Sequence, residues 1–144
     1  MATETEKQKK GLLLSRIIKN GTIVDLNNAR DVDVIDTKFT KSKNGRKAVI
    51  GYCQSVQEGS KPKEKYKCSI IGLEGEMPLS EQRCMFSCNC SRFMYVWEYA
   101  LMRKGAAKII FGNGEPPHQT NPHMLASGCK HLIALCRYLI KQKK

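Results

Sequence analysis

The chain has 144 residues, enough for one domain with a modest core, and 41% of them are hydrophobic. It carries 25 lysines and arginines against 13 acidic residues, so its formal net charge is +12. Such an excess favours contact with a polyanion or with an acidic protein surface. No apolar stretch is long enough for a membrane span, and the polar start Met1–Lys7 lacks the apolar segment of a secretion signal. We therefore expect a chain that is not secreted by a signal peptide and that works in a reducing compartment.

The basic residues are spread along the chain, and no single helix carries a dense basic face. The lysines near the N-terminus and around position 65 are the ones expected to bind a partner, with solvated surface charge as the alternative. They are Lys7, Lys9, Lys10, Lys61, Lys63, Lys65 and Lys67.

Residues 1–30 are expected to form a charged tail and a short docking segment. The tail, residues 1–10, has no hydrophobic periodicity. The docking segment, Leu12–Ile18, is apolar but too short to bury itself, so it must pack on the domain or on a partner.

Residues 31–80 favour a three-stranded antiparallel meander. The predicted strands are Val32–Phe39, Ala48–Val56 and Lys65–Leu73, and Asn44-Gly45 predicts a tight turn between the first two. In a regular second hairpin Cys53 could lie directly opposite Cys68. The more ordinary interpretation of that pair is two small half-buried hydrophobic side chains, and a disulfide or a second metal is the alternative.

Residues 81–144 are predicted to be mainly helical. One helix is expected over Ser91–Arg103, closed by Gly105, and a second over Cys129–Lys144, with Ser127 as its N-cap. A short strand at Lys108–Phe111 and a loop at Gly112–Pro122 lie between them. The expected fold class is α+β, a meander packed on two helices, with residues 31–144 as a single compact domain.

The most informative motifs are Cys88-Asn89-Cys90 and Cys129-Lys130-His131. Three thiolates and one imidazole make the complete tetrahedral ligand set of a structural zinc site. A helix beginning at Cys129 would also favour its thiolate, because the N-terminal N–H groups and the helix dipole stabilise negative charge. The sequence therefore predicts structural Zn²⁺ on Cys88, Cys90, Cys129 and His131.

Other ligand sets are open at this point. Cys84 could replace Cys88, and His123 or His118 could replace His131. An iron–sulfur cluster on Cys84, Cys88, Cys90 and Cys129 is a minor alternative to zinc.

This pattern resembles the SWIM-type zinc finger, whose signature is Cys-x-Cys, a variable insert and Cys-x-His. The resemblance extends over roughly residues 66–138 and implies Cys88, Cys90, Cys129 and His131 as zinc ligands. It also implies protein–protein or DNA-related interaction without catalysis. The insert is longer than is usual in that family, so the resemblance names no partner. The insert, with Asn121-Pro122 and residues 128–132, also resembles small structural proteins of large tailed phages.

These resemblances lead to an expectation of a non-enzymatic, zinc-stabilised subunit of a larger protein assembly. The expected setting is a tailed-phage virion, as a neck, baseplate or capsid accessory part assembled in the host cytoplasm. The alternative is a DNA-binding accessory protein for recombination or replication. Enzyme classes are disfavoured because no phosphate-binding loop, Gly-x-Ser-x-Gly or His-Glu-x-x-His occurs, and four protein ligands leave zinc no open position. Phe39 and Tyr66 are the only aromatic residues beside the lysines of 38–47 and 61–67, which disfavours single-strand binding by stacking.

Overall fold

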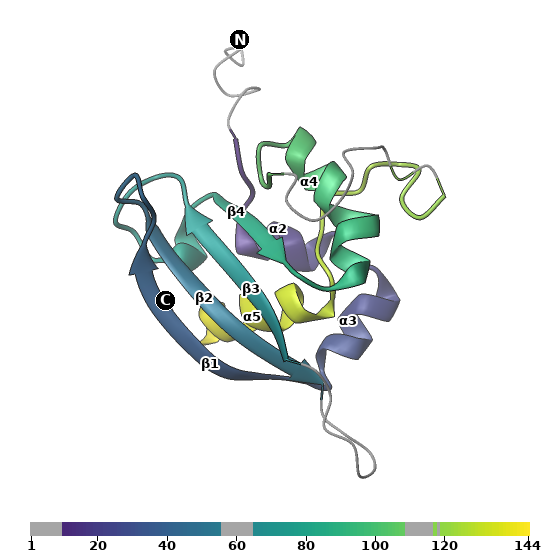
Figure 1. The fold of residues 1–144 in the computed structure, drawn as a ribbon, viewed down its shortest axis with the longest axis horizontal. Helices are drawn as coiled ribbons and strands as arrows, with labels where there is room; N and C mark the ends of the chain where they lie inside the picture. Colours follow the sequence, from purple (N-terminus) through teal and green to yellow (C-terminus); the bar gives the residue numbers. More distant parts are fainter. Residues whose placement is uncertain (1–9, 56–64, 109–116, 118) are drawn as a thin grey trace.

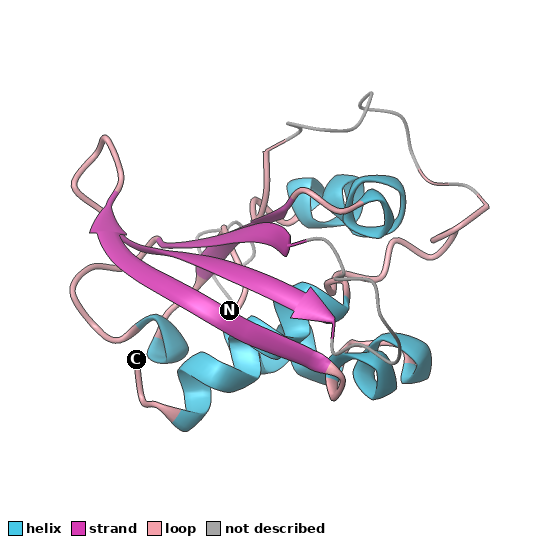
Figure 2. Ribbon diagram, turned by 60° about the horizontal axis from the view of Figure 1, so that its bottom comes forward, coloured by secondary structure: helices cyan, strands magenta, loops and turns pink. Residues whose placement is uncertain are grey.

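The computed structural model describes residues 10–55, 65–108, 117 and 119–144. It is an α+β fold in which one antiparallel sheet, in the order β1-β2-β3-β4, packs on a layer of helices (Figures 1 and 2). The strands are β1 Val32–Lys41, β2 Lys47–Ser55, β3 Lys65–Gly72 and β4 Cys84–Cys88. The helices are α2 Leu14–Lys19, α3 Ile23–Ala29, α4 Glu98–Arg103 and α5 Lys130–Lys141, with a 3-10 turn η1 at Leu79–Glu81 and a π-turn η2 at Phe93–Trp97.

The first three strands occur where the hydrophobic pattern predicts them. The β1–β2 turn contains Gly45 with φ +76°, a backbone conformation that glycine adopts without steric cost. The sheet nevertheless has a fourth strand, so the expected three-stranded meander is incomplete. β4 pairs antiparallel with β3, for example Ile70 with Phe86. Its five residues, two of them cysteines, do not alternate clearly between hydrophobic and polar side chains, so the sequence did not predict a strand there.

Helix α5 packs across one face of the sheet and contributes a buried apolar stripe to the core (Figure 1). Its apolar stripe includes Leu132, Leu135 and Leu139, each fully buried. Inward-facing strand residues such as Val49 and Ile70 meet it and are also fully buried. The other face of the sheet has no described helix across it (Figure 2).

The β2–β3 register differs from the one expected for the two strand cysteines. Cys53 lies opposite Tyr66 and Cys68 lies opposite Gly51, so the two cysteines are diagonal neighbours. Both are free and fully buried against α5. Cys68 lies directly opposite Cys88 on β4, which places its thiol beside the residues discussed below.

The segment before the sheet is part of the fold. It forms two helices, and Leu14 and Ile17 of α2 are fully buried in the common core. Thr22 caps α3 by accepting a hydrogen bond from the Asp25 N–H at 3.1 Å. The predicted tail at residues 1–9 lies outside the described residues.

Two details of the C-terminal half differ from expectation. The N-cap of α5 is Cys129, whereas the Ser127 hydroxyl donates to the Ile17 carbonyl at 2.7 Å and holds the chain against α2. The first predicted helix contains the π-turn η2, and Gly105 follows it with φ +67°, as a helix-terminating glycine does. The short strand predicted at Lys108–Phe111 lies almost entirely outside the described residues.

None of the described helices has the length and apolar character to cross a membrane.

Gly51 permits the close approach of β2 to α5. A Cβ added at this position would lie 2.8 Å from Cδ1 of Leu135. We expect Gly51→Ala to lower the free energy of unfolding by about 1–3 kcal/mol, because the added methyl overpacks the interface. Leu135→Ala alone should cost about 2–5 kcal/mol. In urea unfolding the double variant should lose clearly less than the sum of the two, and simple additivity would contradict the predicted contact.

Candidate metal centre

Four side chains predicted from the two motifs lie together in the interior. The ligand atoms of Cys88, Cys90, Cys129 and His131 are all within 4.8 Å of one another. Cys88 and Cys129 are fully buried, and Cys90 and His131 are 4% and 3% exposed. The cluster is therefore close enough and dry enough to hold one metal ion.

The first cysteine pair is placed by the end of the sheet. Cys88 is the last residue of β4, so its inward direction follows from the strand alternation that also buries Phe86. Asn89 then exchanges two hydrogen bonds with Lys67 on β3, at 3.2 Å through its N–H and 3.0 Å through its side-chain oxygen. These bonds hold the turn that brings the Cys90 sulfur back toward Cys88.

The second pair is placed by the start of α5. Cys129 is the N-cap and His131 lies in the first helical turn, so both side chains project from the same helix end. The thiol of Cys129 makes no capping hydrogen bond and is available to a metal.

The chain that returns to α5 is held by a buried asparagine. The Asn121 amide donates to the carbonyls of Val96 and Leu125 at 3.0 and 2.9 Å, and its oxygen accepts from the Leu125 N–H. Val96 lies in the π-turn, where helical carbonyls lose their usual partners. This asparagine therefore ties the return loop, and with it Cys129, to the helix that follows Cys90.

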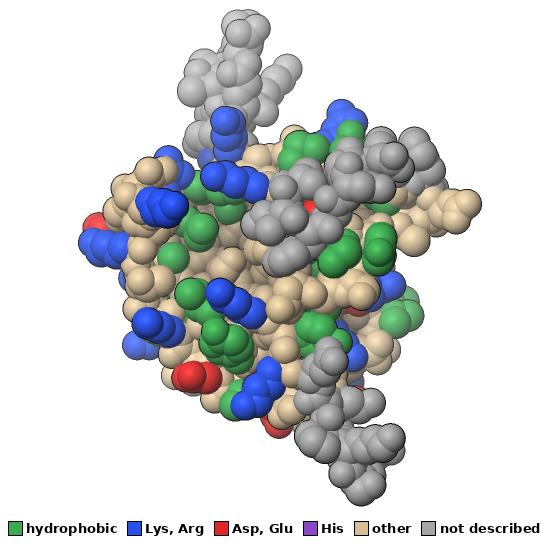
Figure 3. Space-filling model, viewed as in Figure 1, with side chains coloured by type: hydrophobic (Ala, Val, Ile, Leu, Met, Phe, Trp, Pro, Cys, Tyr) green, Lys and Arg blue, Asp and Glu red, His purple; other side chains and the backbone are tan. Residues whose placement is uncertain are grey.

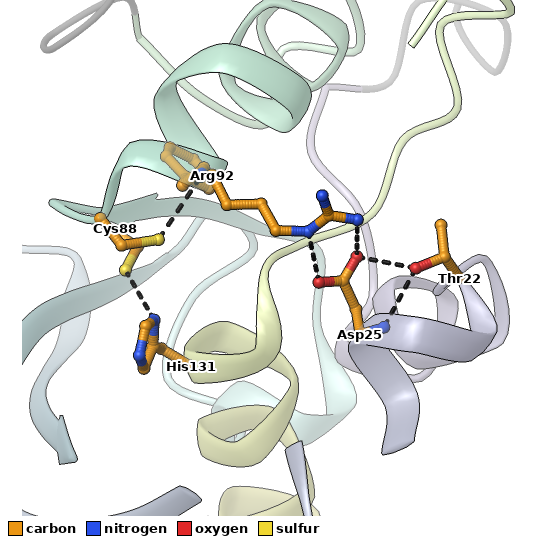
Figure 4. Close-up of polar contacts among 7 residues, drawn as sticks. Thr22, Asp25, Cys88, Arg92 and His131 are labelled. Atoms are coloured by element: carbon orange, nitrogen blue, oxygen red, sulfur yellow. Dashed lines mark hydrogen bonds and ion pairs between the residues drawn. The ribbon is translucent and has the colours of Figure 1, made fainter. Parts of the chain in front are cut away.

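The spacing of the cluster suits zinc. The Sγ of Cys88 lies 3.9 Å from Nδ1 of His131 (Figure 4). Two such ligands on one tetrahedral zinc are about 3.5 Å apart, given Zn–S near 2.3 Å and Zn–N near 2.0 Å. A small contraction of the cluster would therefore complete the coordination. Three sulfurs and one imidazole nitrogen also match the ligand types that structural zinc takes.

His131 is fixed in place by its neighbours. Its ring packs on Tyr66 with the ring centroids 4.4 Å apart, and its backbone carbonyl accepts from the Cys53 thiol at 3.6 Å. Nδ1 faces the sulfurs, whereas Nε2 is buried and has no hydrogen-bond partner among the described residues. A buried imidazole whose only polar contact is to thiols is a costly arrangement unless a metal binds it.

The pKa shifts of the three thiols differ in direction and favour the binding of a cation. The pKa of Cys90 is lowered, because the Cys129 and Cys88 thiols donate to its sulfur and the Phe93 N–H donates at 3.4 Å. The pKa of Cys129 is raised by burial and by Cys88 and Cys90 beside it. The pKa of Cys88 is also raised: contact with Cys129 lowers it, but contacts with Cys68 and Cys90 and burial outweigh this. Only one of the three sulfurs is then readily ionised without a metal, because adjacent buried thiolates repel.

A partly buried ion pair adjoins the cluster, and no motif in the sequence predicted it. Arg92, two residues after Cys90, donates to Asp25 on α3 through Nε at 2.6 Å and through its terminal nitrogen at 2.9 Å (Figure 4). Thr22 donates to the same carboxylate at 2.8 Å. Asp25 is 1% exposed, and the neighbouring carboxylate raises the pKa of Arg92. The pair joins α3 to the loop that carries Cys90.

The alternative ligands are elsewhere. The Cys84 thiol donates to the backbone carbonyls of Leu79 and Gln82 at the far end of β4, and burial raises its pKa to about 12. His123 is exposed and outside the cluster, and His118 lies outside the described residues. The four-cysteine set proposed for an iron–sulfur cluster is therefore not assembled, because Cys84 is separate from the other three.

The predicted binding lysines divide into two groups. Lys10, Lys65 and Lys67 are described and exposed, and the last two lie on β3. Lys7, Lys9, Lys61 and Lys63 lie outside the described residues.

Comparison of the chain with models of protein families, with curated proteins and with solved structures finds no match. The fold and the cluster define a small α+β domain with a buried Cys₃His cluster that could hold a metal ion.

Zinc uptake by the metal-free protein should release about two protons per ion near pH 7.5. The raised pKa values of Cys88 and Cys129 mean that these thiols still carry protons before the metal binds, whereas Cys90 has already lost its own. The affinity should therefore fall as the pH falls, by about 100-fold per pH unit for two protons. Calorimetry in buffers of different ionisation enthalpy measures the release, and fewer than one proton per zinc would contradict the prediction.

Asp25→Ala should lower the free energy of unfolding by about 2–3 kcal/mol, because it removes the carboxylate that pairs with Arg92 and accepts a hydrogen bond from the Thr22 hydroxyl. The loss is below that of a fully buried pair, since the Arg92 side chain is 45% exposed. Asp33→Ala, at an exposed position of β1, is the control and should change stability by less than about 0.5 kcal/mol. If urea unfolding gave the same loss of free energy for both variants, the stabilising role of the ion pair would be contradicted.

Proposed function

We propose that this chain is a non-catalytic interaction subunit whose fold is stabilised by one structural zinc ion. The observation that carries the proposal is the closed cluster of Cys88, Cys90, Cys129 and His131. Four protein ligands satisfy tetrahedral zinc, and the near-complete burial of all four leaves no position for a water or a substrate. Zinc held in this way contributes folding free energy and does not activate a nucleophile.

The position of the cluster supports a structural role. It joins the end of β4 to the start of α5, two elements far apart in the sequence. The closure of such a long loop is entropically costly, so a metal bridge between its ends stabilises the folded state.

The surface supports a role in interaction. Ile23 and Val24 begin α3 and are 78% and 59% exposed, which is unusual for large apolar side chains that follow one another. The chain also carries its net charge of +12. An exposed apolar site and a strongly charged surface are both suited to contact with a larger assembly.

Membership of a tailed-phage particle rests on the resemblance of the insert sequence and stays a prediction. Chemical cross-linking of the native complex, followed by mass spectrometry, would identify the neighbouring chains. Cross-links to virion structural proteins are the expected result. Cross-links confined to enzymes of DNA replication or recombination would favour the alternative.

Protein purified without chelator should contain about one zinc per chain. Cys129→Ala and His131→Ala should each abolish stoichiometric zinc and unfold the C-terminal half, because an incomplete site no longer holds the metal. Metal analysis, thiol titration and thermal melting provide the measurements. A folded protein without metal and with freely titratable thiols would contradict the proposal.

Cys136→Ala is the matched control for Cys129→Ala. Both cysteines belong to the α5 region and both are fully buried, but Cys136 lies outside the cluster. Its replacement should cost only about 1–2 kcal/mol and leave the zinc content unchanged. Loss of zinc in this variant would show that metal content follows general stability and not ligation.

A further inference from the structure

The open face of the sheet has a basic groove that the metal cluster does not use. The groove lies over β3 and β4, between the β1–β2 turn and the segment after α4. Seven lysine and arginine side chains line it against a single carboxylate, Glu74. Figure 3 shows this face, where several basic side chains are spread over the surface and acidic side chains are sparse.

The cations come from separate parts of the chain. Lys43 and Arg46 lie in the β1–β2 turn on one side, and Lys104 and Lys108 follow α4 on the other. Among the described residues none of the seven forms an ion pair with a carboxylate, since the ion pairs of the described residues are Lys41–Glu76 and Arg92–Asp25. The oxygen of Glu74 accepts from the Arg83 N–H at 2.7 Å. Within the described part of the chain, no carboxylate pairs with the positive charge of the rim.

The floor differs chemically from the rim. Outward-facing residues of β3 and β4 form two cross-strand rows, Ser69 beside Ser87 and Ile71 beside Met85. Hydroxyl groups and small apolar surfaces between two cationic borders suit a polymer with anionic groups outside and flat, partly apolar groups inside. A single strand of nucleic acid has this arrangement, whereas a duplex keeps its bases stacked away from such a floor.

Strand pairing supplies an aromatic side chain on the same face. Tyr52 lies directly opposite Lys67, although the two are 15 positions apart in the sequence. Its neighbours Gly51 and Cys53 face α5, so the alternation of β2 turns Tyr52 outward, where it is 36% exposed. Asp36 flanks it on β1. An exposed ring beside a lysine is the combination that stacks a base and binds its phosphate.

We propose that this face binds single-stranded nucleic acid, with phosphates on the cationic rim and bases on the sheet floor and on Tyr52. The site is separate from the metal cluster, so it goes beyond the function proposed above. Binding is expected to depend little on sequence, because backbone contacts and stacking dominate over hydrogen bonds to base edges.

The test is fluorescence anisotropy with a labelled 20-residue thymidine oligonucleotide and the zinc-loaded protein. We expect a submicromolar dissociation constant at physiological salt. The logarithm of the binding constant should fall with the logarithm of the salt concentration with a slope of about −3 to −5, since each phosphate contact contributes about −0.7. Binding only at low salt would overturn the proposal. Tighter binding of a 20-base-pair duplex would also overturn it. Displacement of the oligonucleotide by polyglutamate at equal charge would overturn it too, because it would indicate an acidic protein partner.

Matched variants separate the groove from net charge. The triple variant Lys43→Glu, Arg46→Glu and Lys104→Glu should weaken binding by about tenfold or more at physiological salt and make the salt slope shallower. The control triple variant is Lys19→Glu, Arg30→Glu and Lys141→Glu, which changes the net charge equally at exposed positions outside the groove lining. It should stay within about threefold of the parent protein. An equal loss of affinity in the two triple variants would contradict binding at this groove.

Tyr52 tests the stacking component. Tyr52→Ala should weaken binding by about fivefold or more, and Tyr52→Phe should restore it, because the ring and not the hydroxyl stacks on a base. Zinc content and melting temperature, measured on every variant, separate a failure of this site from a failure of the fold. No change in Tyr52→Ala would overturn stacking on this ring.

Discussion

The structure depends on the contact between the end of β4 and the first turn of α5. Cys88 and Cys90 come from the first, Cys129 and His131 from the second, and their ligand atoms converge within 4.8 Å. Other described contacts of the C-terminal half support this convergence. Asn121 holds the loop that leads to α5, and Ser127 binds this loop to α2. The packing of the apolar stripe of α5 on the sheet fixes the position of the first helical turn.

The same contact is electrostatically unfavourable without a cation. Buried thiolates repel one another, and the pKa values of Cys88 and Cys129 are raised while that of Cys90 is lowered. A divalent metal in the cluster would reverse this balance, because it would stabilise all three thiolates at once and bind the imidazole nitrogen. The Arg92–Asp25 pair adds a second tie between α3 and the Cys90 loop, one that does not need a metal.

The two faces of the sheet carry different kinds of side chain. The inner face meets α5 and carries the core and the metal cluster, so its chemistry is determined by packing. The outer face has no described helix across it and carries a row of lysine, serine and apolar side chains with Tyr52 among them. Because residues alternate between the faces, each strand contributes to both: Cys68 on β3 lies inward beside Cys88, and its neighbours Lys67 and Ser69 lie outward.

The amino-acid sequence alone was sufficient for the fold class, three of the strands and the helix that begins after Cys129. It also indicated the four residues of the cluster, with Cys84, His118 and His123 left open as substitutes. Those features follow from local signals, namely Asn44-Gly45, the apolar stripe of α5 and the paired motifs. The tertiary structure decided the fourth strand, the incorporation of α2 and α3 into the core, the Arg92–Asp25 pair and the separation of Cys84 from the cluster. It also placed Tyr52 beside Lys67, where the sequence showed too few aromatic residues near the lysines. These features depend on register and on contacts between residues far apart in the chain, which a local pattern does not encode.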